Sequence, residues 1–135
     1  TKNKNFHVKL YEKSPVKRAF LKDISDRLSL EIEICGNIYD EFIDTNYIVA
    51  RAFKKLESII QVSREIAKKP HKLIILKGQN AQEDLKKAFN KEKYDYKFEN
   101  SITNKDSKII IVNFKKWRQQ FQWLIKKEEL GKQQL

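Results

Sequence analysis

The sequence predicts an α/β fold whose sheet is parallel in its middle and ends in an antiparallel hairpin. Two short apolar runs, 47–50 and 73–76, lie about one helix length apart, and the segment between them repeats apolar residues at helical spacing. Strand, helix and strand in that order form a right-handed crossover between parallel strands. Two later runs, 94–98 and 109–112, flank a turn-forming stretch and predict an antiparallel pair. Ligands of such sheets bind beyond the carboxyl ends of the strands, so residues at those ends are the first functional candidates.

The first forty residues predict a strand, a helix and a second strand. Apolar and polar residues alternate in Phe6–Glu12, which is typical of a strand with one buried face. Ser14 followed by Pro15 predicts a helix start with serine as the N-cap, and the helix is expected to reach about Leu28. Alternation in Glu31–Cys35 predicts the second strand. The residues expected on the inner face of the helix are Val16, Ala19, Phe20, Ile24, Arg27 and Leu28.

The remaining connections follow from local signals. Residues 37–46 are expected to form a loop with at most one helical turn. The helix after residue 50 is expected to reach about Lys69, because Pro70 stops it. Asn80 followed by Glu83 resembles a capping box that starts a further helix. The apolar face expected for the first of these helices consists of Phe53, Leu56, Ile59, Ile60 and Ile66.

The composition favours a polyanionic partner. The 135 residues carry 29 basic and 18 acidic side chains, a net charge of +11, which points to nucleic acid first and to an anionic membrane surface second. The alternative is a lysine-rich chain with well-solvated faces. One cysteine, Cys35, excludes an internal disulfide and a thiolate zinc site, and we expect it in the core. His7 and His71 lack ligand spacing, so no metal is expected, and no run approaches the ~20 apolar residues of a membrane span. A cytoplasmic protein with no membrane partner is therefore predicted.

Four short motifs, taken together, resemble one family. They are Val8–Glu12, Lys17–Leu21, Ala50–Phe53 and Leu76–Gln79, of which Arg-Ala-Phe and Leu-Lys-Gly at successive strand ends are the most specific. The sequence resembles the bacterial small-subunit (16S) ribosomal RNA guanine-N7 methyltransferases, also called glucose-inhibited division protein B or methyltransferase G, over about residues 6–113. This resemblance implies a Rossmann-like methyltransferase sheet and S-adenosylmethionine as methyl donor. It also implies guanine N7 as the target and 16S rRNA or the small ribosomal subunit as the partner.

The resemblance also implies roles for five residues. Glu12 matches the acidic residue that holds the cofactor ribose, and a carboxylate can accept hydrogen bonds from two vicinal hydroxyls. Tyr39 and Asp40 match the pair that borders the adenine. Arg51 matches an arginine beside the cofactor and the target base, and Lys77 matches a lysine that faces the RNA. No catalytic base is implied, because guanine N7 already carries a free lone pair and mainly needs alignment.

The sequence departs from the family at its N-terminal side. Only three glycines occur, Gly36, Gly78 and Gly131, and no two are close, so a Gly-rich cofactor loop cannot be drawn. We therefore expect this chain to represent the C-terminal part of the enzyme, from a split gene, a decayed gene or a shortened chain. It is expected to be inactive alone, and supply of the N-terminal half by a separate chain is one alternative. The alternative function is a basic RNA- or partner-binding module without catalysis.

Residues 114–135 are expected to form a basic helical tail beyond a partial methyltransferase domain at residues 1–113. Phe114, Trp117, Phe121 and Leu124 share one face of a helix, whereas Trp123 lies off it. Packing of this stripe on the domain is the favoured interpretation. Two alternatives are sequence read through from a shifted frame and a contact with RNA or a membrane surface. The basic residues that flank the aromatic ones are Lys115, Lys116, Arg118, Lys126 and Lys127.

Overall fold

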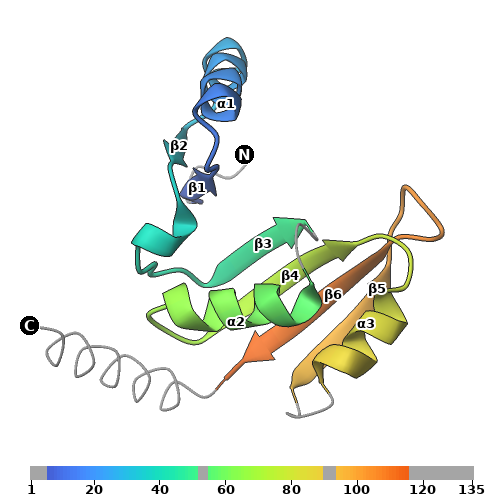
Figure 1. Ribbon diagram of the computed structural model, residues 1–135. Coiled ribbons are helices and arrows are strands. Elements are labelled where there is room, and N and C mark those ends of the chain that lie inside the picture. Colours follow the sequence, from blue (N-terminus) through green and yellow to red (C-terminus); the bar gives the residue numbers. More distant parts are fainter. Residues whose placement is uncertain (1–5, 52–54, 90–93, 116–135) are drawn as a thin grey trace, which may run out of the picture. The chain divides into compact units, whose positions relative to one another are not determined.

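The computed structural model describes residues 6–51, 55–89 and 94–115, which belong to two compact units, residues 1–41 and 42–135 (Figure 1). The first unit holds β1 (Val8–Tyr11), α1 (Pro15–Arg27), β2 (Ile32–Cys35) and the 3-10 turn η1 (Ile38–Asp40). The second holds β3 (Tyr47–Arg51), α2 (Leu56–Ile66), β4 (His71–Lys77), α3 (Ala81–Ala88), β5 (Asp95–Asn100) and β6 (Lys108–Phe114). This order confirms the predicted series of elements, including the single helical turn between residues 37 and 46.

In the first unit, α1 follows directly from the end of β1. β1 and β2 are parallel neighbours. The Ser14 hydroxyl accepts the Lys17 N–H and Pro15 is the first helical residue, which confirms the predicted helix start. Arg18 then reaches back, and its Nη1 donates to the carbonyls of Glu12 at 2.9 Å and Lys13 at 2.8 Å. The helix is thereby fixed to the carboxyl end of its preceding strand.

The predicted inner face of α1 is wrong. Val16 is 80% exposed, Phe20 64% and Leu28 63%, whereas Ser25 is the buried residue of this helix. The predicted Ile24 is half-buried, as is Leu21, which the prediction did not place on this face. Within its own unit α1 has only the two short strands β1 and β2 to pack on, so most of its apolar residues stay uncovered.

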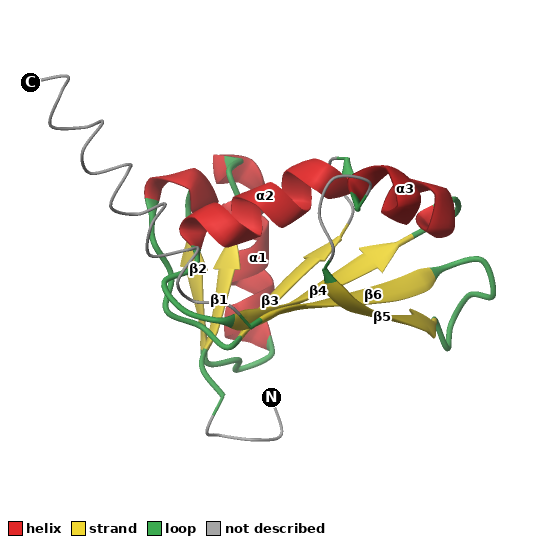
Figure 2. Cartoon of the chain, turned by 90° about the horizontal axis from the view of Figure 1, so that it is seen from below, coloured by secondary structure: helices red, strands yellow, loops and turns green. Residues whose placement is uncertain are grey.

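The second unit is a four-stranded sheet with two helices on one face. Its strand order is β3-β4-β6-β5; β3 and β4 are parallel, and β6 is antiparallel to both β4 and β5. This confirms the predicted crossover and the predicted hairpin. Figure 2 shows α2 and α3 above the same face of this sheet. The buried core lies between these helices and the sheet and comprises Leu56, Ile59, Ile60, Leu73, Ile75, Ala81, Leu85, Ile110 and Val112.

The opposite face of this sheet carries apolar residues that α2 and α3 do not cover. Side chains alternate along each strand, so the neighbours of the buried Leu73 and Ile75 point to this face. Val49 is 64% exposed and lies across from Ile74, which lies across from Ile111. The stripe formed by these residues, which we call the open apolar stripe, consists of Val49, Ile74, Leu76, Ile109 and Ile111.

Helix ends differ from the predictions in two places. α2 ends at Ile66 rather than near Lys69, because Ala67 forms a bridge with Ile43 and the Lys68 N–H donates to the Ile43 carbonyl at 2.9 Å. Extended backbone thereby replaces the last helical turn. At the start of α3 the predicted capping box is wrong: Asn80 is the N-cap, but it has φ of 65° and its side chain makes no capping hydrogen bond.

The end of β6 corrects the start expected for the tail. Phe114 is the last residue of β6 and not the first of a helix, and its ring lies 4.8 Å from the ring of His71. His71 is 4% exposed, with Nδ1 3.1 Å from the Lys69 carbonyl and Nε2 3.3 Å from the Ser63 hydroxyl. Because a carbonyl can only accept, Nδ1 carries the proton of the neutral ring. Residues 116–135, and with them the rest of the expected tail, lie outside the described residues.

Candidate functional site

The structure brings two of the predicted site residues to one edge of the second sheet. Arg51 is the last residue of β3 and Lys77 the last of β4, and the parallel register places Arg51 opposite Leu76. Arg51 is exposed and Lys77 half-buried. Two cations therefore end neighbouring parallel strands, at the edge where ligands of α/β sheets bind.

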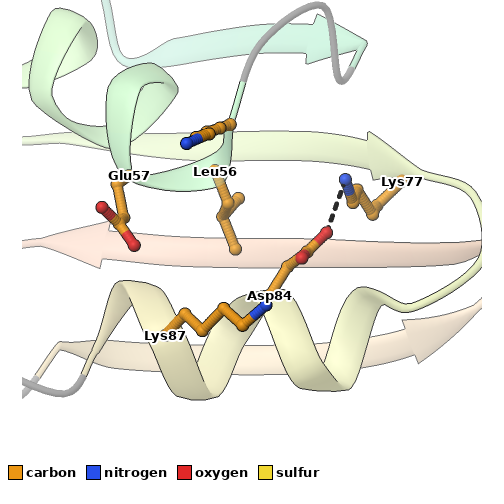
Figure 3. A pocket seen from close by; sticks show the side chains of 6 residues that line it. Leu56, Glu57, Lys77, Asp84 and Lys87 are labelled. Carbon is orange, nitrogen blue, oxygen red and sulfur yellow. Dashed lines mark ion pairs between the residues drawn. The ribbon is translucent and has the colours of Figure 1, made fainter.

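Lys77 is held by an acidic residue of α3. Its ammonium lies 2.7 Å from the Asp84 carboxylate, and the two side chains are 17% and 31% exposed. Figure 3 shows the pair spanning from the end of β4 to α3. Asp84 stands in the first turn of α3, where a negative charge also interacts favourably with the helix dipole. The pair fixes the direction of the lysine side chain.

A cavity of about 420 Å³ opens beside this ion pair, and its lining is almost entirely charged. It lies where the start of α2 and the side of α3 approach the end of β4 (Figure 3). Leu56 is the single apolar residue among those that line it, and it is buried. The full lining is Lys55, Leu56, Glu57, Lys77, Asp84 and Lys87.

In the first unit, Glu12 stands directly after β1. Its N–H donates to the Cys35 carbonyl at 3.2 Å and so extends the β1–β2 ladder. Its carboxylate Oε1 accepts the Ser14 N–H at 3.0 Å. One oxygen of the carboxylate is thus used in the turn into α1, and the side chain is fixed at the carboxyl end of the strand.

Tyr39 and Asp40 belong to the turn that follows β2, so Glu12 and these two residues share the carboxyl side of the β1–β2 pair. The Tyr39 N–H donates to the Asn37 side chain at 3.1 Å, which starts the 3-10 turn, and Tyr39 as a whole residue is 46% exposed. Asp40 is the last residue of the turn, and its side chain lies outside what the structure describes. Glu12, Tyr39 and Asp40 lie in one unit and Arg51 and Lys77 in the other.

The first unit also contains a tyrosine–glutamate hydrogen bond that was not predicted from the sequence. The Tyr11 hydroxyl donates to the Glu41 carboxylate at 2.8 Å. Burial, followed by the hydrogen bond to Glu41, raises the pKa of Tyr11 well above its ordinary value. Burial also raises the pKa of the Cys35 thiol, with the charge of Glu33 adding to the effect. Cys35 is half-buried and is not part of the buried core, so the expected core position is wrong.

Sequence reasoning also missed Asp84, Lys55 and Lys87. The available signal was the position of Asp84, one turn into the helix that follows the Lys77–Gly78 strand end. Within the described ranges, no group of three or more His, Cys, Asp or Glu residues is arranged to hold a metal ion. In the same part of the chain, no helix combines the length and the apolar character needed to span a membrane.

Two solved structures share the fold. A predicted O-methyltransferase from Agrobacterium tumefaciens superposes with a TM-score of 0.62 at 11% identity, covering 79% of this chain and 62% of that one. An rRNA methylase from Streptococcus thermophilus superposes with a TM-score of 0.58 at 8% identity, covering 82% and 74%. At such identities the similarity shows the fold alone, which is the α/β fold of S-adenosylmethionine-dependent methyltransferases with an antiparallel region in a mixed sheet.

Sequence comparison is more specific. Residues 2–112 match the family model GidB, described as rRNA small subunit methyltransferase G. A ribosomal RNA small subunit methyltransferase G from Pelagibacter ubique (strain HTCC1062) is 35% identical over 111 residues, which are 81% of this chain and 51% of the relative. The protein of that name from Rickettsia typhi (strain ATCC VR-144 / Wilmington) is 33% identical over 107 residues, 78% of this chain and 56% of the relative.

The chain thus spans about half the length of the curated relatives it matches. The family match spans nearly all of the first unit and the second unit as far as residue 112, and it includes Glu12, Tyr39, Asp40, Arg51 and Lys77. This chain belongs to the GidB family of rRNA small subunit methyltransferases G.

Proposed function

We propose that this chain forms part of a 16S rRNA guanine-N7 methyltransferase. The observation that carries the proposal is the placement of Arg51 and Lys77 at the ends of adjacent parallel strands in a chain of this family. In this proposal Arg51 lies beside both the cofactor and the target base, and Lys77 faces the RNA. Glu12, Tyr39 and Asp40 complete the cofactor contacts.

The residues of the first unit have the chemistry that S-adenosylmethionine requires. Glu12 offers a carboxylate oriented by the Ser14 N–H, and a carboxylate is a suitable acceptor for the two ribose hydroxyls. Tyr39 offers an exposed aromatic ring for the adenine, and Asp40 an acceptor for its amino group. When bound, S-adenosylmethionine supplies an electrophilic methyl group on a sulfonium.

The protein's task in this reaction is alignment. Guanine N7 attacks with its own lone pair, so no side chain has to remove a proton from it first. S-adenosylmethionine, held by Glu12, Tyr39, Asp40 and Arg51, would supply the methyl group together with its positive charge, and no residue of this chain would have to take up either. Positioning of both reactants in line therefore supplies most of what the chain can contribute. Arg51, at the end of a strand, is fixed at its backbone for such a role.

A second candidate function is an RNA-binding module without catalysis. The lysines that line the cavity favour it, as does the spacing of the three glycines, which leaves no Gly-rich cradle in this sequence. Both functions predict RNA binding, and only the first predicts methyl transfer.

Reconstitution distinguishes the two functions. Unmethylated 16S rRNA and S-adenosylmethionine are incubated with this chain, with the part of the Pelagibacter relative that this chain does not match, or with both. Mass spectrometry of the nuclease digest then measures 7-methylguanosine. We expect product only with both polypeptides, and less of it with Arg51→Gln than with the exposed-lysine control Lys72→Gln. Absence of product with both, while the intact relative methylates the same RNA, would overturn the proposal.

A further inference from the structure

The cavity beside β4 has a lining that suits a polyanion rather than a small apolar molecule. Small-molecule sites are lined mainly by apolar and aromatic side chains, with a few polar groups among them. Here five of the six lining residues are charged, and the sixth, Leu56, is 3% exposed. The positive charges outnumber the negative ones, in a chain whose net charge is +11.

The three lysines of the cavity are not equivalent. Lys77 is neutralised by Asp84 at 2.7 Å. Within the described residues, no ion pair within 4.0 Å involves Lys55 or Lys87. Both side chains are exposed, one just before α2 and the other in the last turn of α3. Their ammonium groups are therefore the ones that an incoming anion meets.

Lysine ammonium groups bind phosphate as compact point charges, and phosphate contacts fix the register of a nucleic acid on a protein. We propose that Lys55 and Lys87 bind phosphate groups of the RNA backbone and so position the RNA at the edge that carries Arg51. This rests on the proposed function only in taking RNA as the ligand. Lys77 is then the lysine that Asp84 orients, and Glu57 limits how strongly the cavity attracts any anion.

The test measures RNA affinity of the full-length chain as a function of salt. A fluorescently labelled single-stranded RNA oligonucleotide is titrated with the wild type, with Lys55→Gln/Lys87→Gln, and with the control Lys72→Gln/Lys86→Gln. Both double variants remove two charges from exposed lysines, but Lys72 and Lys86 do not line the cavity. We expect the cavity variant to lose about tenfold in affinity and to lower the salt slope by about 1.4, the value for two single-strand phosphates. The control should lose less than about threefold, as expected for a general charge effect.

A substitution that removes a negative charge from the cavity lining provides a second test, with the opposite expected effect on RNA affinity. Glu57→Gln removes a negative charge from the lining and should tighten RNA binding about twofold, whereas Glu83→Gln, exposed on α3 outside the lining, should change it less. Because these side chains are exposed, circular dichroism and melting should be unchanged in all variants.

Equal losses in the cavity and control variants, or no RNA binding by the wild type, would overturn the inference. Failure of methyl transfer with the cavity effect intact would count against the proposed function alone. Methyl transfer with no cavity effect would count against this inference alone.

Discussion

The ammonium of Lys77 and the carboxylate of Asp84 lie 2.7 Å apart and connect the end of β4 to the first turn of α3. The two side chains are at most one-third exposed, so water screens the pair less than it screens an exposed pair such as Arg27 with Asp23. The pair joins residues that are neighbours in space but belong to different elements, and it forms one wall of the lysine-lined cavity.

Removing the acidic partner should destabilise the fold. In Asp84→Asn, the ammonium of Lys77 remains partly buried without its counter-charge, which should lower the free energy of unfolding by about 1–2 kcal/mol, between the values for exposed and fully buried pairs. Urea unfolding, followed by circular dichroism, measures this decrease in the free energy of unfolding. The matched control is Glu57→Gln, which removes the same charge from the same cavity at an exposed position. Equal losses in the two variants would show that the ion pair contributes nothing.

The stability of the fold should fall as the pH is lowered below about 6.5, because of His71. Burial lowers the pKa of His71 below its ordinary value of 6.5. Between the two pKa values the unfolded chain binds more protons than the folded one, so stability rises with pH in that window. The contribution of His71 is therefore complete above pH 6.5 and is lost progressively as the pH falls.

Denaturant unfolding at pH 5.0 and 7.5 tests this. In His71→Gln the part of the pH dependence that comes from this ring should disappear, although the variant is less stable at both pH values because the contact with Phe114 is lost. His7→Gln is the control, since His7 is exposed and pairs with the exposed Glu33. If His71→Gln keeps the full difference between pH 5.0 and 7.5, other groups cause it.

S-adenosylmethionine should bind to this chain alone weakly or not at all. The cofactor contacts proposed for Glu12, Tyr39 and Asp40 all lie in the first unit, and this sequence has no pair of nearby glycines from which a backbone cradle could form. Isothermal titration calorimetry measures the affinity of this chain for S-adenosylmethionine, with the full-length Pelagibacter relative as the positive control. Micromolar affinity of this chain alone would mean that the residues of Glu12–Arg51 suffice for binding.

The sequence predicted the order of the elements because that order depends on local signals. The alternation in β5, the apolar run in β6, the turn at Asn104–Ser107 and the Ser14–Pro15 helix start are each signals that act within a few residues. The inner face of α1 was not predictable in this way. Which side of a helix is buried depends on the elements it packs against, and only Ser25 is buried in α1.

The candidate site was also only partly predictable, and again the residues that depend on tertiary packing were missed. Arg51 and Lys77 could be placed at one edge of the sheet because neighbouring parallel strands have their carboxyl ends at the same edge. The partner of Lys77 could not be predicted, since Asp84 meets it only after α3 has folded back on the sheet. Lys55 and Lys87 appear in the sequence as two of many lysines, and only the cavity distinguishes them.

The last prediction concerns residues 116–135 and the open apolar stripe. The stripe lies on the sheet face opposite α2 and α3, where Val49 is 64% and Leu76 41% exposed. Lys115, the last residue that the structure describes, forms an ion pair with Asp95 at 2.6 Å. Asp95 lies opposite Asn113 in register and, by alternation with the core-packed Phe98, on the same face as the stripe. The Lys115 ammonium therefore lies on the uncovered side of the sheet, next to Asp95.

Truncation after Lys115 should therefore lower the melting temperature by several degrees and increase the binding of a dye that recognises apolar surface. A loss of about 1 kcal/mol corresponds to roughly 4–8 °C in a domain of about 60–100 residues, which is the size range of the second unit. In the full chain, Trp117→Ser/Phe121→Ser should reproduce the effect, because both residues lie on the apolar face of the expected helix, whereas Trp123→Ser, off that face, should not. Unchanged melting with a selective loss of RNA affinity would instead make the tail an RNA contact, and the open apolar stripe would remain uncovered by this chain.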